Sequence, residues 1–100
     1  MDIFGKLNEM KEKMDEVKLR LDTISVSGEA GEGLVKVTAS GNREIKDIKI
    51  DESLLSVDNK EQVEELLTVA INRALENAEN VNQAEIRAAS SGFLPDLPGL

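Results

Sequence analysis

The chain of 100 residues has no cysteine, histidine, tryptophan or tyrosine, and its only aromatic side chains are two phenylalanines. Without cysteine, nothing indicates a disulfide-stabilised secreted domain. Without histidine, the chain lacks the commonest general acid or base and the commonest metal ligand. No apolar run approaches the ~20 residues that cross a bilayer, and the charged N-terminus has no signal-peptide core. We therefore expect a cytoplasmic, non-enzymatic protein with no cofactor, metal site, small-molecule substrate or membrane partner.

Negative charge exceeds positive charge, and the excess is concentrated in one half of the chain. Lysine and arginine number 12, aspartate and glutamate number 20, and the formal net charge is −8. Residues 52–100 carry nine acidic and three basic side chains, which accounts for −6 of that charge. A uniformly basic nucleic-acid-binding domain is therefore excluded, whereas a local basic surface is not.

The first segment predicts an amphipathic helix over about residues 3–22. Its apolar residues step by 4, 3, 4, 3, 4 and 3, which is a heptad seam: Ile3, Leu7, Met10, Met14, Val17, Leu21 and Ile24. Basic side chains flank this seam on both sides, while the acidic side chains lie farther from it. The flanking residues are Lys6, Lys11, Lys13, Lys18 and Arg20. A parallel pair of such helices would set Lys against Lys or Arg, so we expect the seam to face an acidic partner.

Three strand-like segments follow the helix. Alternating side chains predict strands at 23–27, 34–40 and 44–50, with Val35 and Val37 on the apolar face of the sheet. The connections are short, so all three strands should be antiparallel. A three-stranded sheet with one apolar face needs a cover, which a second helix can supply.

Glycine marks both connections between these strands. We expect the first connection to be a mobile turn that contains Gly28, Gly31 and Gly33. The second is expected to be a hairpin turn at Ser40-Gly41-Asn42, where glycine or asparagine accommodates a positive φ.

The last long segment predicts a second helix over about residues 59–90. Asp58 is the expected N-cap, Glu61 is its capping-box partner, and Gly92 is placed to end the helix. One apolar stripe contains Val63, Leu67, Ala70, Ala74 and Ala78. Because this helix is acidic, we expect the first helix to pack antiparallel against it, with basic flanks facing acidic ones.

Other patterns that suggest chemistry have simpler explanations. Glu61, Glu64 and Glu65 share one helical turn, which is typical of a solvated face rather than a metal site. The GEAGEG stretch lacks the Lys and Ser/Thr of a phosphate-binding loop and precedes a strand instead of a helix. The serines have no histidine to activate them.

These observations predict an α+β fold in the order α-β-β-β-α, with a three-stranded antiparallel sheet flanked by two long helices. The domain should cover residues 1–92, and residues 93–100 form a tail that contains proline and glycine. A small core and exposed strand edges favour a homodimer.

The order of several short sequence words resembles one family. The words are Phe4-Gly5-Lys6, GEAGEGLVKV at 28–37, Ser40-Gly41-Asn42, Ile48-Lys49-Ile50-Asp51, Ser53-Leu54-Leu55, Val69-Ala70-Ile71-Asn72 and Ser91-Gly92. Together they resemble the YbaB/EbfC family of bacterial nucleoid-associated proteins over nearly the whole chain. The resemblance implies a non-enzymatic homodimer with projecting helical arms that binds double-stranded DNA at the nucleoid and affects nucleoid organisation and gene expression.

Carried to this chain, the resemblance implies DNA contacts from basic residues on the two helices. The candidates are Lys6, Lys11, Lys13, Lys18, Arg20, Arg73 and Arg87. Phosphate contacts require only such side chains along a surface. Ion pairing within or between helices explains the same pattern at least as well. The acidic second helix also leaves open a protein-interaction or scaffold dimer with little DNA affinity.

Overall fold

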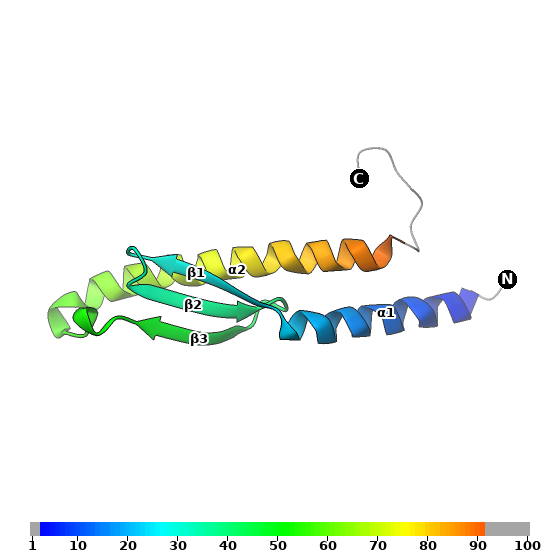
Figure 1. Cartoon of the computed structure of the whole chain (residues 1–100), viewed down its shortest axis with the longest axis horizontal. Coiled ribbons are helices and arrows are strands. Elements are labelled where there is room, and N and C mark those ends of the chain that lie inside the picture. The colour runs from blue at the N-terminus through cyan, green and yellow to red at the C-terminus, as the bar shows by residue number, and fades with distance from the viewer. Residues whose placement is uncertain (1–2, 92–100) are drawn as a thin grey trace, which may run out of the picture.

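The computed structural model describes residues 3–91 and has the predicted order of elements (Figure 1). The elements are α1 (Ile3–Thr23), β1 (Ser25–Ala30), β2 (Val35–Ser40), β3 (Ile45–Ile50), two short 3₁₀ turns, η1 (Glu52–Leu54) and η2 (Val57–Asn59), and α2 (Lys60–Ser90). The α+β fold class is therefore confirmed. Gly92 and the tail at 93–100 lie outside the described residues. Within the described part, no helix is both long and apolar enough to span a membrane.

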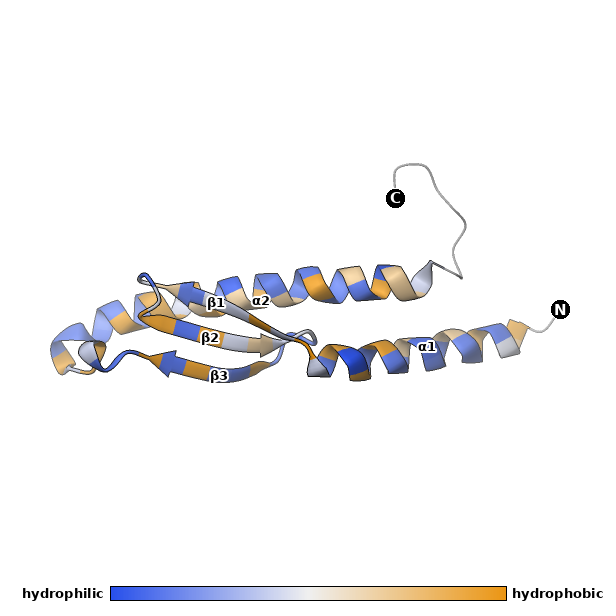
Figure 2. Ribbon diagram, in the orientation of Figure 1, coloured by the Kyte–Doolittle hydropathy of each residue, from blue (hydrophilic) through white to orange (hydrophobic). Residues whose placement is uncertain are grey.

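The three strands form one antiparallel sheet in the order β1-β2-β3. Val35, Val37 and Ala39 of β2 are fully buried on the face toward α2, as the alternation predicts. Ile50 pairs with Val35 and Ile48 pairs with Val37, so the isoleucines of β3 share that face. Figure 2 shows the alternation of hydrophobic and hydrophilic residues along β2 and β3.

A β-bulge explains why β3 alternates less regularly than β2. Asp47 pairs with Thr38, but the next residue of β2, Ala39, pairs with Ile45, so Lys46 is an extra residue in β3. The bulge restores Ile45 to the apolar face despite its three-residue spacing from Ile48.

The helix α2 covers β1 and β2 at very close range. Ala70, Ala74 and Ala78 are fully buried and present only methyl groups to the sheet. At Gly28 of β1, an added Cβ would lie 2.3 Å from the Ala74 nitrogen and 2.4 Å from the Ala70 oxygen. The prediction that Gly28 belongs to a turn is therefore wrong. Gly28 lies in β1, which extends to Ala30. At this position only glycine leaves room for the backbone of α2.

The two turns differ from expectation in which residues take positive φ. The first turn uses Gly31, Glu32 and Gly33, with φ of 65°, 56° and 88°. In the second turn neither Gly41 nor Asn42 does so, and Arg43 has φ of 64°. The left-handed residue of this three-residue loop stands at its last position, as is common in such hairpins.

The start of α2 also differs from the sequence prediction. Asp58 lies inside η2 and not at the N-cap, and Asn59 at the N-cap makes no side-chain capping bond. The Lys60 amide instead donates to the Val57 oxygen, as the last bond of the 3₁₀ turn. One of the first backbone amides of α2 is therefore satisfied by a carbonyl of the 3₁₀ turn and not by a capping side chain.

Beyond the sheet, α1 and α2 run antiparallel as two arms (Figure 1), which confirms the predicted orientation. Val17 and Leu21 of the seam are buried. Farther toward the N-terminus the seam is open, with Ile3, Leu7 and Met10 exposed by 61%, 55% and 37%. The first turns of α1 reach beyond the last described turn of α2, so the seam is covered over its C-terminal half only.

The close approach at Gly28 predicts a large cost for any side chain at this position. Gly28→Ala should lower the free energy of unfolding by more than about 3 kcal/mol, because the new methyl group meets backbone atoms that cannot rotate away. Gly33→Ala is the matched control. No atom lies within 4 Å of its Cβ, and its positive φ costs only about 1–2 kcal/mol. Urea unfolding would contradict this packing if both variants lost the same stability.

Candidate nucleic-acid interface

The basic residues of α1 form two rows beside the seam. Lys6, Lys13 and Arg20 follow one another at seven-residue steps on one flank, and Lys11 and Lys18 do so on the other. All five residues are exposed. With a rise of ~1.5 Å per residue, the rows extend over about 20 Å of the helix.

Most of this positive charge is unpaired within residues 3–91. The four lysines of the rows make no ion pair with any described residue. Arg20 differs, because its Nη2 lies 2.5 Å from Oε2 of Glu85 in α2. We predicted that basic flanks of α1 would pair with acidic flanks of α2. Between the described parts of the two helices, a single ion pair of this kind forms. Such an exposed pair contributes only ~0–1 kcal/mol, so apolar packing holds the arms together.

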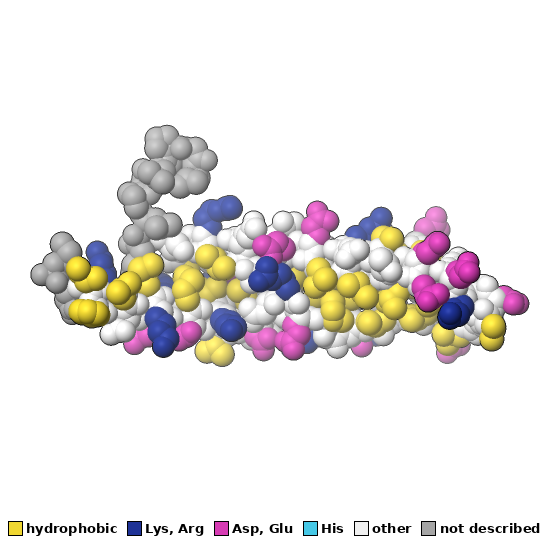
Figure 3. All heavy atoms as spheres, turned by 180° about the vertical axis from the view of Figure 1, so that it is seen from behind, with side chains coloured by type: hydrophobic (Ala, Val, Ile, Leu, Met, Phe, Trp, Pro, Cys, Tyr) yellow, Lys and Arg dark blue, Asp and Glu magenta, His cyan; other side chains and the backbone are white. Residues whose placement is uncertain are grey.

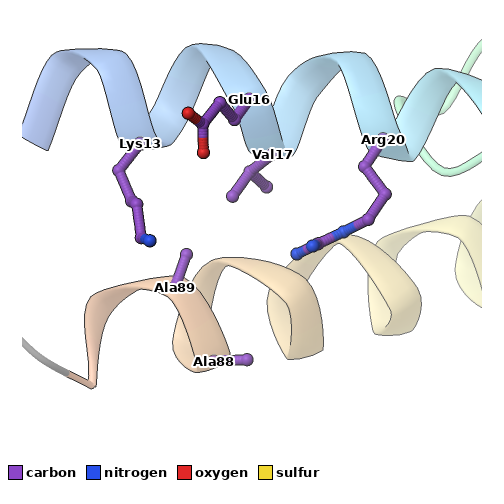
Figure 4. Close-up of a pocket in the computed structure, with 6 residues that line it drawn as sticks. All are labelled: Lys13, Glu16, Val17, Arg20, Ala88 and Ala89. Carbon is purple, nitrogen blue, oxygen red and sulfur yellow. The ribbon is translucent and has the colours of Figure 1, made fainter.

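A groove of about 300 Å³ separates the arms on the side of the Lys13 row. Figure 4 shows Lys13 and Arg20 extending from α1 toward α2, with Val17 between them. Ala88 and Ala89 form the α2 wall, and these small side chains leave the space open. Among the described residues that line the groove, Glu16 is acidic, whereas Lys13 and Arg20 are basic.

The base of the arms is held by hydrogen bonds that the sequence did not indicate. Asn82 of α2 donates to the Gly41 oxygen at 3.0 Å, and Asn42 donates to the Lys18 oxygen of α1 at 2.9 Å. Arg43 forms an ion pair with Glu79 of α2. These contacts fix the β2–β3 turn against both helices. A single asparagine in a polar stretch has no periodic signature, so sequence reasoning missed these residues.

The two arginines of α2 lie in different places. Arg73 donates to the Glu29 oxygen at 2.7 Å, next to Asn77, which donates to the Ser27 oxygen at 2.8 Å. Both acceptors belong to the edge strand β1, so Arg73 is not brought to the lysine rows. Arg87 is exposed in the last turn of α2, beside the Ala88 of the groove.

Acidic side chains of α2 are spread along its solvent face. Glu61, Glu64 and Glu65 are all exposed, and Glu64 lies 4.0 Å from Lys60 of the same helix. Among residues 3–91, no three acidic side chains converge closely enough to hold a metal ion. These carboxylates form a solvated surface.

The fold is a small sheet that carries two helical arms, and the described residues present exposed lysines along one of them. The model of the YbaB/EbfC DNA-binding family matches residues 1–93, and the chain belongs to that family. The resemblance seen in the sequence is thereby confirmed.

Relatives of known name and a solved structure agree with this assignment. The chain is 40% identical over 100 residues to a nucleoid-associated protein of Flavobacterium johnsoniae, covering 100% of this chain and 92% of the relative. It is 44% identical over 98 residues to a nucleoid-associated protein of Bordetella avium, covering 98% and 89%. The crystal structure of an uncharacterized Helicobacter pylori protein superposes with a TM-score of 0.76 at 28% identity, covering 84% of this chain and 91% of that one.

The contact between Arg43 and Glu79 predicts a measurable pKa change. Hydrogen bonds from Arg43 and, secondarily, Gln83 hold the pKa of Glu79 below its usual value. The folded state therefore favours the carboxylate, and this contribution to stability is lost as the pH falls through the folded-state pKa. In Arg43→Gln, the Glu79 pKa should rise, as followed by carboxyl NMR titration. Lys46→Gln should leave it unchanged. Equal Glu79 pKa values in the wild type and Arg43→Gln would exclude the contact.

Proposed function

We propose that this protein is a nucleoid-associated protein of the bacterial cytoplasm that binds double-stranded DNA as a homodimer and affects nucleoid organisation and gene expression. The observation that supports this most is the set of four exposed lysines on α1 without an ion-pair partner in residues 3–91, on a chain of net charge −8. The family description and the names of the relatives support the same proposal.

The electrostatics favour DNA contact along the lysine rows of α1. Double-stranded DNA carries one negative charge per ~1.7 Å of its axis, so rows of lysine about 20 Å long face many phosphates. Acidic residues populate the solvent face of α2, which repels the duplex. Binding by phosphate contacts positions the protein without direct recognition of the base sequence.

The surroundings of each cation divide the candidate set in two. In our proposal, Lys6, Lys11, Lys13, Lys18 and Arg87 contact phosphates. Arg20 is assigned mainly to the Glu85 pair, and Arg73 to the edge of β1. An arginine already bound to a carboxylate or a carbonyl must give up that bond before it can bind a phosphate.

The homodimer is proposed to form at the β3 side of the sheet. At the other edge, Arg73 and Asn77 already donate to two carbonyls of β1, those of Glu29 and Ser27, which disfavours strand pairing there. On β3, Ile45 and Ile48 remain 37% and 42% exposed, because α2 leans toward β1. Figure 3 shows hydrophobic side chains in a band along this face of the molecule. A second copy that covers the band would complete the small core.

The dimer proposal predicts that a charge on the inner face of β3 separates the protomers. Ile48→Lys should shift the protein from twice the mass of the chain to the mass of a single chain at micromolar concentration, because a buried, unpaired ammonium is costly. Sedimentation equilibrium measures this mass. Leu19→Lys is the control, since Leu19 is 74% exposed on α1 and should not change it. A stable Ile48→Lys dimer would place the interface elsewhere.

The DNA proposal predicts steep salt dependence. Five cations in each of two protomers, the four lysines and Arg87, make about 10 phosphate contacts, so affinity should fall roughly 10⁵-fold between ~50 and ~200 mM salt. Lys13→Gln/Lys18→Gln removes four of these ten cations from the dimer and should reduce the slope of log affinity against log salt by roughly 40%. Fluorescence anisotropy with a labelled duplex measures both quantities.

A matched double variant tests whether position matters as well as charge. Lys36→Gln/Lys49→Gln removes the same charge from two exposed residues that face each other on β2 and β3. It should retain the wild-type salt slope. Equal slopes for the two double variants would reject the arm as the contact surface. An intact dimer that fails to bind duplex even at low salt would reject DNA binding and favour the scaffold alternative.

A further inference from the structure

The seam of α1 continues beyond the helix that covers it. Val17 and Leu21 are buried, whereas Ile3, Leu7 and Met10 on the same stripe are exposed by 61%, 55% and 37%. The exposed part spans about 10 Å along the helix, with a lysine row on each side. Large apolar side chains in one contiguous row are a typical site for a further contact.

The direction of α2 indicates which segment is nearest to this row. Ala89, close to the end of α2, lines the same groove as Lys13 of α1 (Figure 4). Since the helices are antiparallel, α2 points toward the N-terminal turns of α1 (Figure 1). The C-terminal end of α2 therefore lies beside the place where the seam becomes uncovered.

The sequence of residues 92–100 is apolar and acidic, which complements an exposed apolar row flanked by lysines. The segment is GFLPDLPGL, with four large apolar side chains, one acidic side chain and no basic one. In extended form it reaches up to ~30 Å, about three times the length of the exposed row. Its two prolines disfavour a helix and suit an extended conformation.

We propose that residues 93–100 bind in extended form along the open seam of α1 of the same chain, between its two lysine rows. Phe93, Leu94 and Leu97 supply the apolar contacts, and Asp96 lies between rows of opposite charge. The covalent link gives the segment a high effective concentration at the seam. A parallel α1 from a second copy fits less well, because it would bring lysines together. The proposal does not depend on DNA binding.

Hydrogen exchange of the full-length protein tests this contact. In Leu94→Ser/Leu97→Ser, amides of residues 4–12 should exchange roughly 5-fold or more faster than in the wild type, as expected when a helix end loses its cover. Amides of β2 should remain unchanged. Val57→Ser, which alters a side chain 90% exposed near the start of α2, should not affect residues 4–12. Identical exchange of residues 4–12 in the wild type and the double variant would reject the proposal.

A cross-linking experiment identifies the origin of the segment. The chain has no cysteine, so Met10→Cys with Leu94→Cys creates a single reactive pair. A short bismaleimide should join the two within one chain, as seen by denaturing electrophoresis and peptide mass. Leu19→Cys with Leu94→Cys is the control, since Leu19 lies on the opposite face of α1 and should link far less. Links between chains, or equal yields for the two pairs, would overturn the assignment.

Discussion

The contact of α2 with β1 at Gly28 determines the position of the other elements. Backbone meets backbone there, with Ala70 and Ala74 opposite a residue that has no side chain. This approach draws α2 over β1 and β2 and away from β3, so Ile48 keeps an exposed face. It also directs the second half of α2 past the end of the sheet, where it meets α1. The uncovered strand and the paired arms both follow from one close contact.

Apolar packing, more than charge pairing, joins the arms. Val17 and Leu21 are buried against α2, while a single exposed ion pair, Arg20 with Glu85, links the described helices. Exposed pairs are weak, and long lysine side chains gain little from being fixed in one conformation. The lysine rows are thus left open although the chain is acidic as a whole. Net charge describes the average surface, whereas phosphate binding depends on the local one.

Periodicity in the sequence predicted the elements, but not the contacts between them. The heptad seam, the alternation of β2 and the long final helix gave the correct order because each pattern is local. Gly28 was misassigned because its role depends on Ala70 and Ala74 of α2, which lie more than forty residues away in sequence. Asp58 was misassigned because a 3₁₀ turn took over the bond that a cap would make. The lysine rows follow from heptad positions, but the different surroundings of Arg20 and Arg73 appear only in three dimensions.

The two edges of the sheet have opposite properties, and this asymmetry connects the fold to assembly. Asn77 and Arg73 donate to the Ser27 and Glu29 carbonyls of β1, so two acceptors of this edge are satisfied within the chain. Ile45 and Ile48 of β3 stay exposed among residues 3–91, and the bulge turns Ile45 to the same face as Ile48. In the proposed dimer, a second copy would meet a single receptive side, which favours a closed pair over an open-ended array. In that proposed dimer, Arg73 would therefore limit pairing at the β1 edge, because it already donates to the Glu29 oxygen.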